Sequence, residues 1–314
     1  MRIYVYPTDK RWFDYLEAKR GLDEVNFWRP GGQVAFKGLS EGEILLFRLK
    51  SPINQIAGGG VFLRAGLLPL SLMWESFGEK NGTSSIDLFR AAIAKFKKVS
   101  PPSLLPLDTS LGYVILLDPV FLPPAQWIPV PDDFPLELVQ GKAYDAAMGT
   151  GRELFLWAQS ELFRQRPRIV SEVQAGDENL GPTIGPEALV RRRLGQGAFK
   201  IVVTEIYQRR CAITGERTLP VLEAAHIQPV SAGGEHRASN GLLLRSDIHR
   251  LFDLGYVGID ADLRFRVSEA LRESWHNGRV YYDLDKREVR PPENAALRPS
   301  RELLSWHMQN VYRG

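Results

Sequence analysis

A chain of 314 residues exceeds one ordinary hydrophobic core and suits two domains, each large enough to fold without cross-links. Its 44% hydrophobic and 25% charged residues exclude a disordered or fibrous protein, the net charge is only +3, and no apolar run reaches membrane-spanning length. The segment Met1–Tyr6 has the pattern of a strand rather than a signal peptide, so we expect a cytoplasmic protein that does not bind membranes. Because Cys211 is the single cysteine, an intrachain disulfide is excluded and no structural zinc is expected.

The charge is unevenly distributed along the chain. Residues 189–314 contain 20 Lys and Arg against 15 Asp and Glu, a net of +5, whereas residues 1–168 have a net of +2. Between them, residues 169–188 contain four acidic residues, no basic residue, and both Gly and Pro. We interpret this acidic segment as a linker between two domains, 1–168 and 189–314, the second of which carries the positive charge that a polyanionic partner requires.

The N-terminal domain is predicted to combine strands and helices. Gly42–Leu49 has the composition of a buried strand, and Ile53–Phe62 is a second strand loosened by Gly58-Gly59-Gly60, where a bulge or close backbone approach is expected. Tyr113–Leu117 predicts a further strand and Gly151–Phe163 a closing helix. Another helix is predicted at Ser85–Lys98, with a packed face formed by Leu88, Phe89, Ala92, Ile93 and Phe96.

An aromatic motif, Asn26-Phe27-Trp28-Arg29-Pro30, precedes these strands. The order of this motif, the buried strand and the glycine-rich strand resembles the EVE branch of the PUA superfamily over about residues 1–165. These are small β-barrels related to the SRA domains that read modified cytosine. The resemblance implies that one base is flipped out of the duplex and stacked on aromatic side chains. The residues implied are Trp28, Phe27 and Trp74 for stacking, with Trp12 and Phe13 in reserve, Asn26 or Asn54 for a base edge, and Arg29 and Lys50 for phosphates.

The C-terminal domain begins with a basic segment, Arg191-Arg192-Arg193, and a predicted helix, Ala198–Arg210. The helix has apolar positions with the spacing of one face, namely Phe199, Val202, Val203, Ile206 and Tyr207. The pattern then changes to a strand at Val221–Ala225, a loop, a strand at Leu242–Leu244, and a helix at Arg245–Leu254 that ends before Gly255. His226 follows the first strand, Asn240 precedes the second, and His249 lies on the helix. This order brings three separated polar residues to one small surface.

The ordered His226, Asn240 and His249 resemble the HNH nucleases, whose shared core is the ββα-metal finger. The resemblance implies that His226 is the general base, that Asn240 braces the loop, and that His249 binds one divalent ion, Mg²⁺ or Mn²⁺. Imidazole suits the first role because its ordinary pKa of about 6.5 is close to the operating pH. The implied products are a 5′ phosphate and a 3′ hydroxyl. Predicted phosphate contacts in this domain are Arg191, Arg192, Arg193, Lys200, Arg245 and Arg250.

One position departs from the family pattern. The residue before the general base is usually an Asp or His that binds the metal, and here it is Ala225. A single protein ligand holds a divalent ion poorly, so another oxygen is required. Glu223, on the same strand face as Ala225, and Asp253, one turn beyond His249, are both candidates, and the sequence does not distinguish them.

The remaining predictions concern the rest of the domain. Strands are expected at Tyr256–Ile259, Leu263–Val267 and Val280–Leu284, and a helix at Arg301–Val311. Of the other histidines, His236 is interpreted as a solvated loop residue, and His276 and His307 as structural. Cys211 is interpreted as a small buried apolar residue.

These patterns together predict an α+β fold, with a PUA/EVE-like β-barrel and packed helices at the N-terminus and a ββα-metal HNH domain at the C-terminus. The function implied is a modification-dependent restriction endonuclease that acts on double-stranded DNA, as a homodimer because cutting both strands needs two active sites. Two alternatives remain open. The first is a catalytically silent nucleic-acid-binding protein, and the second is an HNH nuclease gated by a barrel that binds a small ligand.

Overall fold

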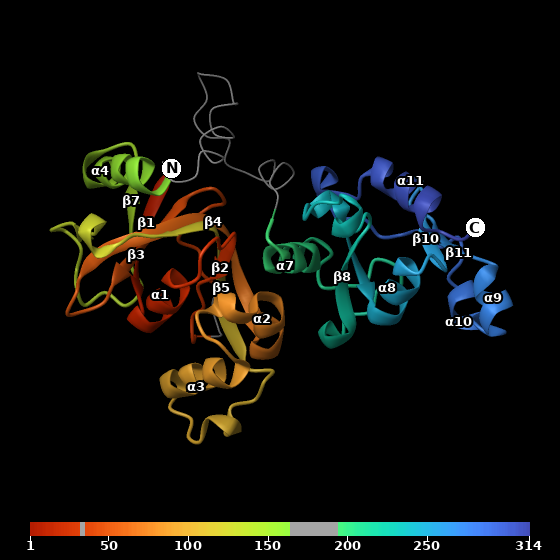
Figure 1. The fold of residues 1–314 in the computed structure, drawn as a ribbon, viewed down its shortest axis with the longest axis horizontal. Coiled ribbons are helices and arrows are strands. Elements are labelled where there is room, and N and C mark those ends of the chain that lie inside the picture. The colour runs from red at the N-terminus through yellow and green to blue at the C-terminus, as the bar shows by residue number, and fades with distance from the viewer. Residues whose placement is uncertain (32–34, 164–193) are drawn as a thin grey trace. The chain divides into compact units, whose positions relative to one another are not determined.

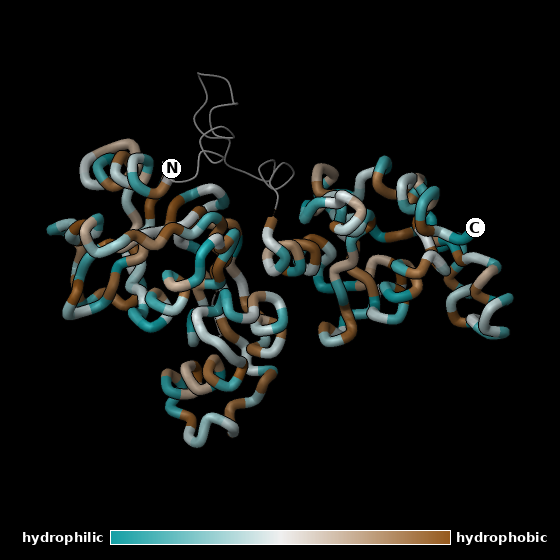
Figure 2. The backbone as a smooth tube through the Cα atoms, in the orientation of Figure 1, coloured by the Kyte–Doolittle hydropathy of each residue, from teal (hydrophilic) through white to brown (hydrophobic). Residues whose placement is uncertain are grey.

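The computed structural model describes residues 1–31, 35–163 and 194–314, which belong to two compact units, Met1–Ala188 and Leu189–Gly314 (Figure 1). The expected linker, residues 169–188, and the three arginines 191–193 lie outside the described residues. In Figure 2 the hydrophobic stretches are short and alternate with hydrophilic residues. No helix in the described part of the chain is long and apolar enough to cross a membrane.

A mixed sheet forms the centre of the first unit. Its strands are β1 (Arg2–Thr8), β2 (Glu24–Asn26), β3 (Ile44–Leu49), β4 (Gln55–Pro69), β5 (Ser110–Phe121), β6 (Ile128–Pro129) and β7 (Lys142–Asp145). Their order is β2-β5-β4-β3-β1-β7, with β6 added to β4, and only β1 and β3 are parallel. Every residue of β3 is buried because apolar clusters cover both faces of the sheet. The strands predicted from the sequence are therefore confirmed at β1, β3, β4 and β5.

The sheet is open rather than a closed barrel. The two ends of the hydrogen-bonded order, β2 and β7, do not pair with each other in the described residues, and each is only a few residues long. A barrel requires continuous pairing around the whole circumference, so the expected closed barrel is not found here. The glycine-rich stretch does produce the predicted irregularity, since the register of β4 on β5 shifts between Gly59 and Val61. Gly58 has a φ of +153°, and a Cβ there would lie 2.1 Å from the carbonyl oxygen of Val120.

The described residues of this unit also form the α-helices α1 (Lys10–Glu17), α2 (Leu70–Phe77), α3 (Ile86–Lys97) and α4 (Gly149–Ala158), the last continued by a π-helix at Gln159–Phe163. The helices predicted at α3 and α4 are confirmed. The predicted face of α3 is too wide, because Leu88 is 56% and Phe96 50% exposed, while Phe89 and Ile93 are buried. Helix α1 was not predicted from the sequence.

The second unit contains the predicted strand–strand–helix order. Helix α7 (Gln196–Ile206) comes first, followed by β8 (Leu222–His226), β9 (Gly241–Arg245), α8 (Ser246–Asp253), β10 (Val257–Ile259), β11 (Phe265–Val267), α9 (Ala270–Trp275), α10 (Arg279–Tyr282) and α11 (Arg301–Asn310). The strand predicted at Val280–Leu284 is wrong, because α10 occupies this segment. Its aromatic and β-branched residues favour a strand locally, but Tyr281 donates to Asp247 and Tyr282 to the carbonyl of Ser268, which fixes the helical turn.

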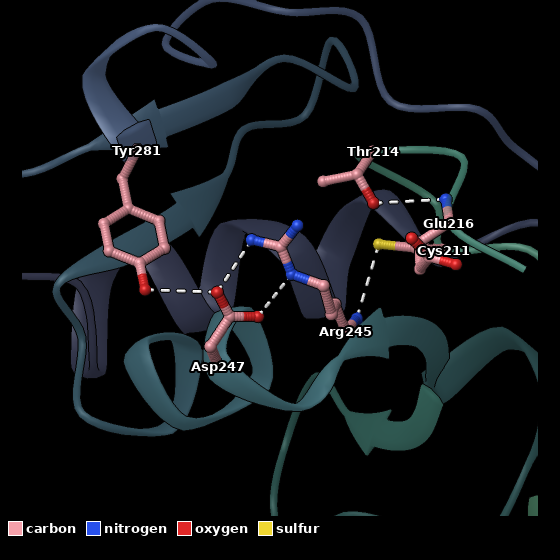
Figure 3. Close-up of polar contacts among 6 residues, drawn as sticks. All are labelled: Cys211, Thr214, Glu216, Arg245, Asp247 and Tyr281. Carbon is pink, nitrogen blue, oxygen red and sulfur yellow. Dashed lines mark hydrogen bonds and ion pairs between the residues drawn. The ribbon is translucent and has the colours of Figure 1, made fainter. Parts of the chain in front are cut away.

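A polar network fastens the junction of β9 and α8 to its neighbours (Figure 3). The guanidinium of Arg245 donates two hydrogen bonds to the carboxylate of Asp247, at 2.6 and 2.7 Å, and Tyr281 donates to the same carboxylate at 3.1 Å. On the other side, the backbone N–H of Arg245 donates to the thiol sulfur of Cys211 at 3.3 Å. Cys211 is buried, as expected, and the network holds the start of α8 in place.

Candidate active site

The hairpin register positions the two ends of the loop that carries the site. His226, the last residue of β8, pairs with Gly241, the first residue of β9, so Asn240 lies beside the end of β8. Asn240 is 2% exposed and makes three hydrogen bonds across the loop. Its Oδ1 accepts from the N–H of Gln228, and its Nδ2 donates to the carbonyls of Gln228 and Glu235, at 2.9 to 3.0 Å. These contacts fix both halves of the loop to β9.

The imidazole of His226 is held by two rings. Phe199 of α7 stacks on it with centroids 4.0 Å apart and planes 9° apart, and its Nε2 lies 2.9 Å from Nδ1 of His236. The expectation that His236 is a solvated loop residue is therefore wrong; the side chain is half-buried against His226 and Phe199. Burial, together with smaller effects of positive charge on His236 and His249, lowers the pKa of His226 to about 4. His226 is thus uncharged near neutral pH.

His249 of α8 lies between two carboxylates. Its Nδ1 is 2.6 Å from Oε2 of Glu223 on β8, and its Nε2 is 3.4 Å from Oδ2 of Asp253, one helical turn away. Both residues that the sequence proposed as the missing metal ligand therefore contact His249. Burial raises the pKa of Asp253, opposed by the positive charges of His249 and Arg250 and reinforced by the negative charge of Glu223. The side chains are partly exposed, 21% for His249 and about half for the two acids, so substrate can reach them.

The two carboxylates approach opposite nitrogens of the ring. A single ion bound to one nitrogen of His249 can therefore have only one of them as a co-ligand in this arrangement. In agreement, the described residues contain no group of three or more His, Cys, Asp or Glu side chains placed to hold one ion. An imidazole nitrogen and one carboxylate are nevertheless donors that Mg²⁺ or Mn²⁺ accept, because Mg²⁺ keeps several waters and takes further oxygens from substrate phosphates. The residues present fit such an ion.

Residues 211–260 match the HNH endonuclease family. This segment contains β8, β9 and α8, and with them His226, Asn240 and His249. The chain therefore includes an HNH endonuclease domain. Among solved structures, the chain is similar to one described as "Modification dependent TagI restriction endonuclease", with 12% identity, a TM-score of 0.30, and coverage of 98% of this chain and 81% of that chain. At such a TM-score the similarity supports no conclusion about function. No curated protein matches the sequence.

The basic residues predicted to contact phosphates differ in their surroundings within the second unit. The guanidinium of Arg245 is paired with Asp247, as described above. Arg250 is exposed on α8 and close enough to Asp253 to act on its pKa. Lys200 is half-buried on α7. Of the two predicted arginines that the structure describes in this unit, Arg250 is therefore the exposed one.

Two of the residues predicted to bind a base and two predicted to contact phosphates line one pocket in the first unit. Phe27, Trp28, Arg29 and Lys50 surround a cavity of about 180 Å³. Trp28 is fixed by a hydrogen bond of 3.0 Å from its Nε1 to the carbonyl of Asn81. The reserve residue Trp12 is also in the lining, and the other lining residues are Tyr6, Pro7, Asp9, Pro30, Phe96 and Val139.

The motif around Trp28 gave no indication of Tyr6 or Asp9 as pocket residues. They come from the end of β1 and the start of α1, and only the folding of the sheet brings them to Trp28. One sequence signal could have indicated a helix start at Asp9, because an aspartate there precedes an amphipathic segment. In the structure its side chain caps α1 by accepting from the N–H of Arg11.

The remaining predicted base-binding residues lie outside this pocket. Asn26 is fully buried and bonded to Asn81 and to the N–H of Val114, so its amide is already occupied. The Oδ1 of Asn54 accepts from Arg48 at 2.7 Å. Trp74 packs beside Phe89, with centroids 6.0 Å apart. The reserve residue Phe13 belongs to the apolar cluster on one face of the sheet.

Proposed function

We propose that this chain is a metal-dependent DNA endonuclease that hydrolyses phosphodiester bonds and leaves 5′ phosphates and 3′ hydroxyls. The observation that carries the proposal is an uncharged, ring-stacked His226 at the end of β8, on the same ββα unit as His249 and its carboxylates. The match of this segment to the HNH endonuclease family supports the same conclusion.

His226 acts as the general base in this proposal. Its lone pair is available near neutral pH because burial keeps the pKa at about 4. Phosphates bound close to the ring raise that pKa, since negative charge favours the imidazolium form, and the imidazole then accepts a proton from water more readily. Phe199 prevents the ring from turning away, and Asn240 keeps the loop after β8 in register with β9.

The metal site is assigned to His249 and Asp253. If Nδ1–H of His249 donates to Glu223, the lone pair of Nε2 faces Asp253 and is free to bind the ion. A carboxylate that accepts a hydrogen bond from the non-ligating nitrogen fixes the tautomer and orientation of a metal-binding imidazole. Glu223 has this role in the proposal. When bound, the divalent cation polarises the scissile phosphate and stabilises the leaving oxygen.

Calorimetric titration with Mn²⁺ tests this assignment. Asp253→Asn removes a ligand and is expected to weaken binding by roughly 100-fold, whereas Glu223→Gln retains an acceptor for Nδ1–H and costs about tenfold. Asp262→Asn, an exposed aspartate between β10 and β11, is the matched control and should leave the affinity unchanged. If Glu223→Gln weakens binding more than Asp253→Asn, Glu223 is the ligand.

We further propose that the first unit is an EVE- or PUA-like reader of a modified base, with cytosine derivatives as the leading candidates. The pocket at Trp28 supports this, because it combines aromatic walls with Arg29 and Lys50. A flipped base would stack on Trp28, at a gain of about 1–3 kcal/mol that offsets the cost of unstacking. Such a reader would restrict an HNH domain of low sequence selectivity to modified, foreign DNA. A homodimer would allow both strands to be cut in one encounter.

Digestion of defined DNA tests the whole proposal. The full chain, with Mg²⁺ or Mn²⁺, is incubated with an unmodified plasmid, the same plasmid carrying 5-methylcytosine, and hydroxymethylated or glucosylated phage DNA. We expect cleavage of at least one modified substrate and none by His226→Ala, which should still bind DNA. Binding without cleavage would favour the catalytically silent alternative. Equal cleavage of all three substrates would support the proposed nuclease activity but contradict the proposal that the first unit recognises a modified base.

A further inference from the structure

The loop between β8 and β9 carries a histidine that the proposed mechanism does not use. Nδ1 of His236 lies 2.9 Å from Nε2 of His226, and the two rings are inclined by 60° with centroids 4.9 Å apart. This is a hydrogen-bond distance and not merely a packing contact. His226 is thereby held at one face by Phe199 and at one nitrogen by His236.

The backbone around His236 is itself fixed. Its carbonyl accepts from the N–H of Leu194 at 2.8 Å, and the carbonyl of the preceding residue, Glu235, accepts from Nδ2 of Asn240 at 2.9 Å. The imidazole of His236 is therefore presented to His226 by a loop that Asn240 fastens. The position of the His236 imidazole is therefore fixed by the fold of the loop.

Whether His226 can accept a proton from water depends on which of the two rings carries the hydrogen of their shared hydrogen bond. If Nδ1–H of His236 donates, Nε2 of His226 is the acceptor, Nδ1 of His226 carries the hydrogen, and no lone pair is left for water. If Nε2–H of His226 donates to Nδ1 of His236, the lone pair on Nδ1 of His226 is free. Only the second arrangement lets His226 act as a base. A neutral imidazole in this position also stabilises the imidazolium that forms when His226 takes a proton, as a carboxylate or carbonyl partner does in other sites.

We propose that His236 is the positioning residue of His226: its Nδ1 accepts the Nε2–H of His226, which fixes the tautomer and leaves Nδ1 of His226 to take the proton from water. This inference rests on the proposed function, in which His226 is the general base. In this role His236 acts through His226 and not on the substrate, so substitutions of His236 are expected to change the rate of the chemical step and not DNA binding.

Two substitutions separate a positioning role from simple packing. His236→Leu fills a similar volume without an acceptor. His236→Asn places Oδ1 the same number of bonds from the backbone as Nδ1 and keeps an acceptor that does not titrate. His276→Asn, on an exposed histidine with φ of +53°, a conformation that Asn tolerates, is the matched control.

The first measurement is cleavage of a DNA substrate by the full chain with Mg²⁺ over a range of pH. His236→Leu should lower kcat by roughly 100-fold with KM changed less than about threefold, and His236→Asn should recover to within about tenfold of the parent. His276→Asn should match the parent. A Leu variant within about threefold of the parent, or an Asn variant as slow as the Leu variant, overturns the proposal.

The second measurement needs no activity. In the parent protein labelled with ¹⁵N-histidine, ring-nitrogen NMR at neutral pH should show His226 protonated at Nε2 and not at Nδ1, with His226→Gln and His236→Asn used to assign the signals. Protonation of His226 at Nδ1 overturns the proposal even if every variant is inactive. Full cleavage by His226→Ala would instead refute the proposed function, so the two failures are distinguishable.

Discussion

Acid should destabilise the second unit, which contains the HNH domain, through His307. This side chain, on α11, is 1% exposed and stacks on Phe252 of α8 with centroids 3.7 Å apart. Its Nε2–H donates to the carbonyl of Phe252 at 3.1 Å, while Nδ1 is buried without a hydrogen-bond partner among the described residues. Protonation would place a charge and an unsatisfied N–H at Nδ1. Burial consequently lowers the pKa of His307 to about 4, against an ordinary value of 6.5.

The sign and size of the effect follow from proton linkage. The unfolded chain binds a proton at His307 below 6.5, whereas the folded domain does so only near 4, so stability is lost as the pH falls through this window. Between about pH 7.5 and pH 5 the loss amounts to about 2 kcal/mol for this one group. Because α8 carries His249 and Asp253, the proposed metal site should loosen together with the α8–α11 contact.

Urea unfolding at the two pH values measures the effect, with amide hydrogen exchange of α8 and α11 assigning it to the HNH domain. His307→Phe retains an aromatic ring on Phe252 but cannot titrate, so its stability should fall by about 2 kcal/mol less than that of the parent over the same interval. His276→Asn removes an exposed histidine and should follow the parent. The reasoning would be refuted if the difference in unfolding free energy between the parent and His307→Phe changed by less than about 0.5 kcal/mol between the two pH values.

Three further outcomes are expected. Asn240→Ala leaves the N–H and the carbonyl of Gln228 unpaired, whereas the carbonyl of Glu235 still accepts from the N–H of Arg237. It should destabilise the second unit by about 3 kcal/mol in urea titrations, with cleavage reduced in parallel; a loss below about 1 kcal/mol would contradict the bracing role. A Cβ at Gly241 would lie 2.4 Å from Cγ2 of Val203 and 3.1 Å from Cε2 of Phe199, so Gly241→Ala should shift both side chains of α7, including the ring that stacks on His226, and lower kcat roughly tenfold. An unchanged kcat would show that the chemical step does not depend on this packing. Trp28→Ala should weaken binding to modified duplex by about 1–3 kcal/mol in fluorescence titrations and leave plain duplex nearly unaffected; equal losses would remove Trp28 from base recognition.

The ββα core was predictable because its signals are local. His226, Asn240 and His249 occur within one continuous stretch, in which turn residues separate two short apolar runs and a glycine follows the helix. Elements of this kind are specified by residues a few positions apart. The register of the hairpin, with Ala225 opposite Leu242 across a long loop, is not among these local signals.

Other features depend on contacts between distant segments. The open sheet pairs Arg2 of β1 with Asp145 of β7, a partner that no local pattern identifies. The helical turn at α10 is likewise fixed by the contact of Tyr281 with Asp247, against the strand propensity of its own residues. In both cases tertiary contacts outweigh the local preference.

The sequence by itself determined the strand–strand–helix order around the site and the residue types within it, because periodicity and turn chemistry act over short distances. Only the tertiary structure decided which side chains meet. It placed His236 against His226, and Glu223 and Asp253 on opposite nitrogens of His249. It also brought the end of β1 to Trp28. Side-chain direction depends on the packing of whole elements, and the position of a ring nitrogen within 3 Å of a partner is not encoded in spacing along the chain.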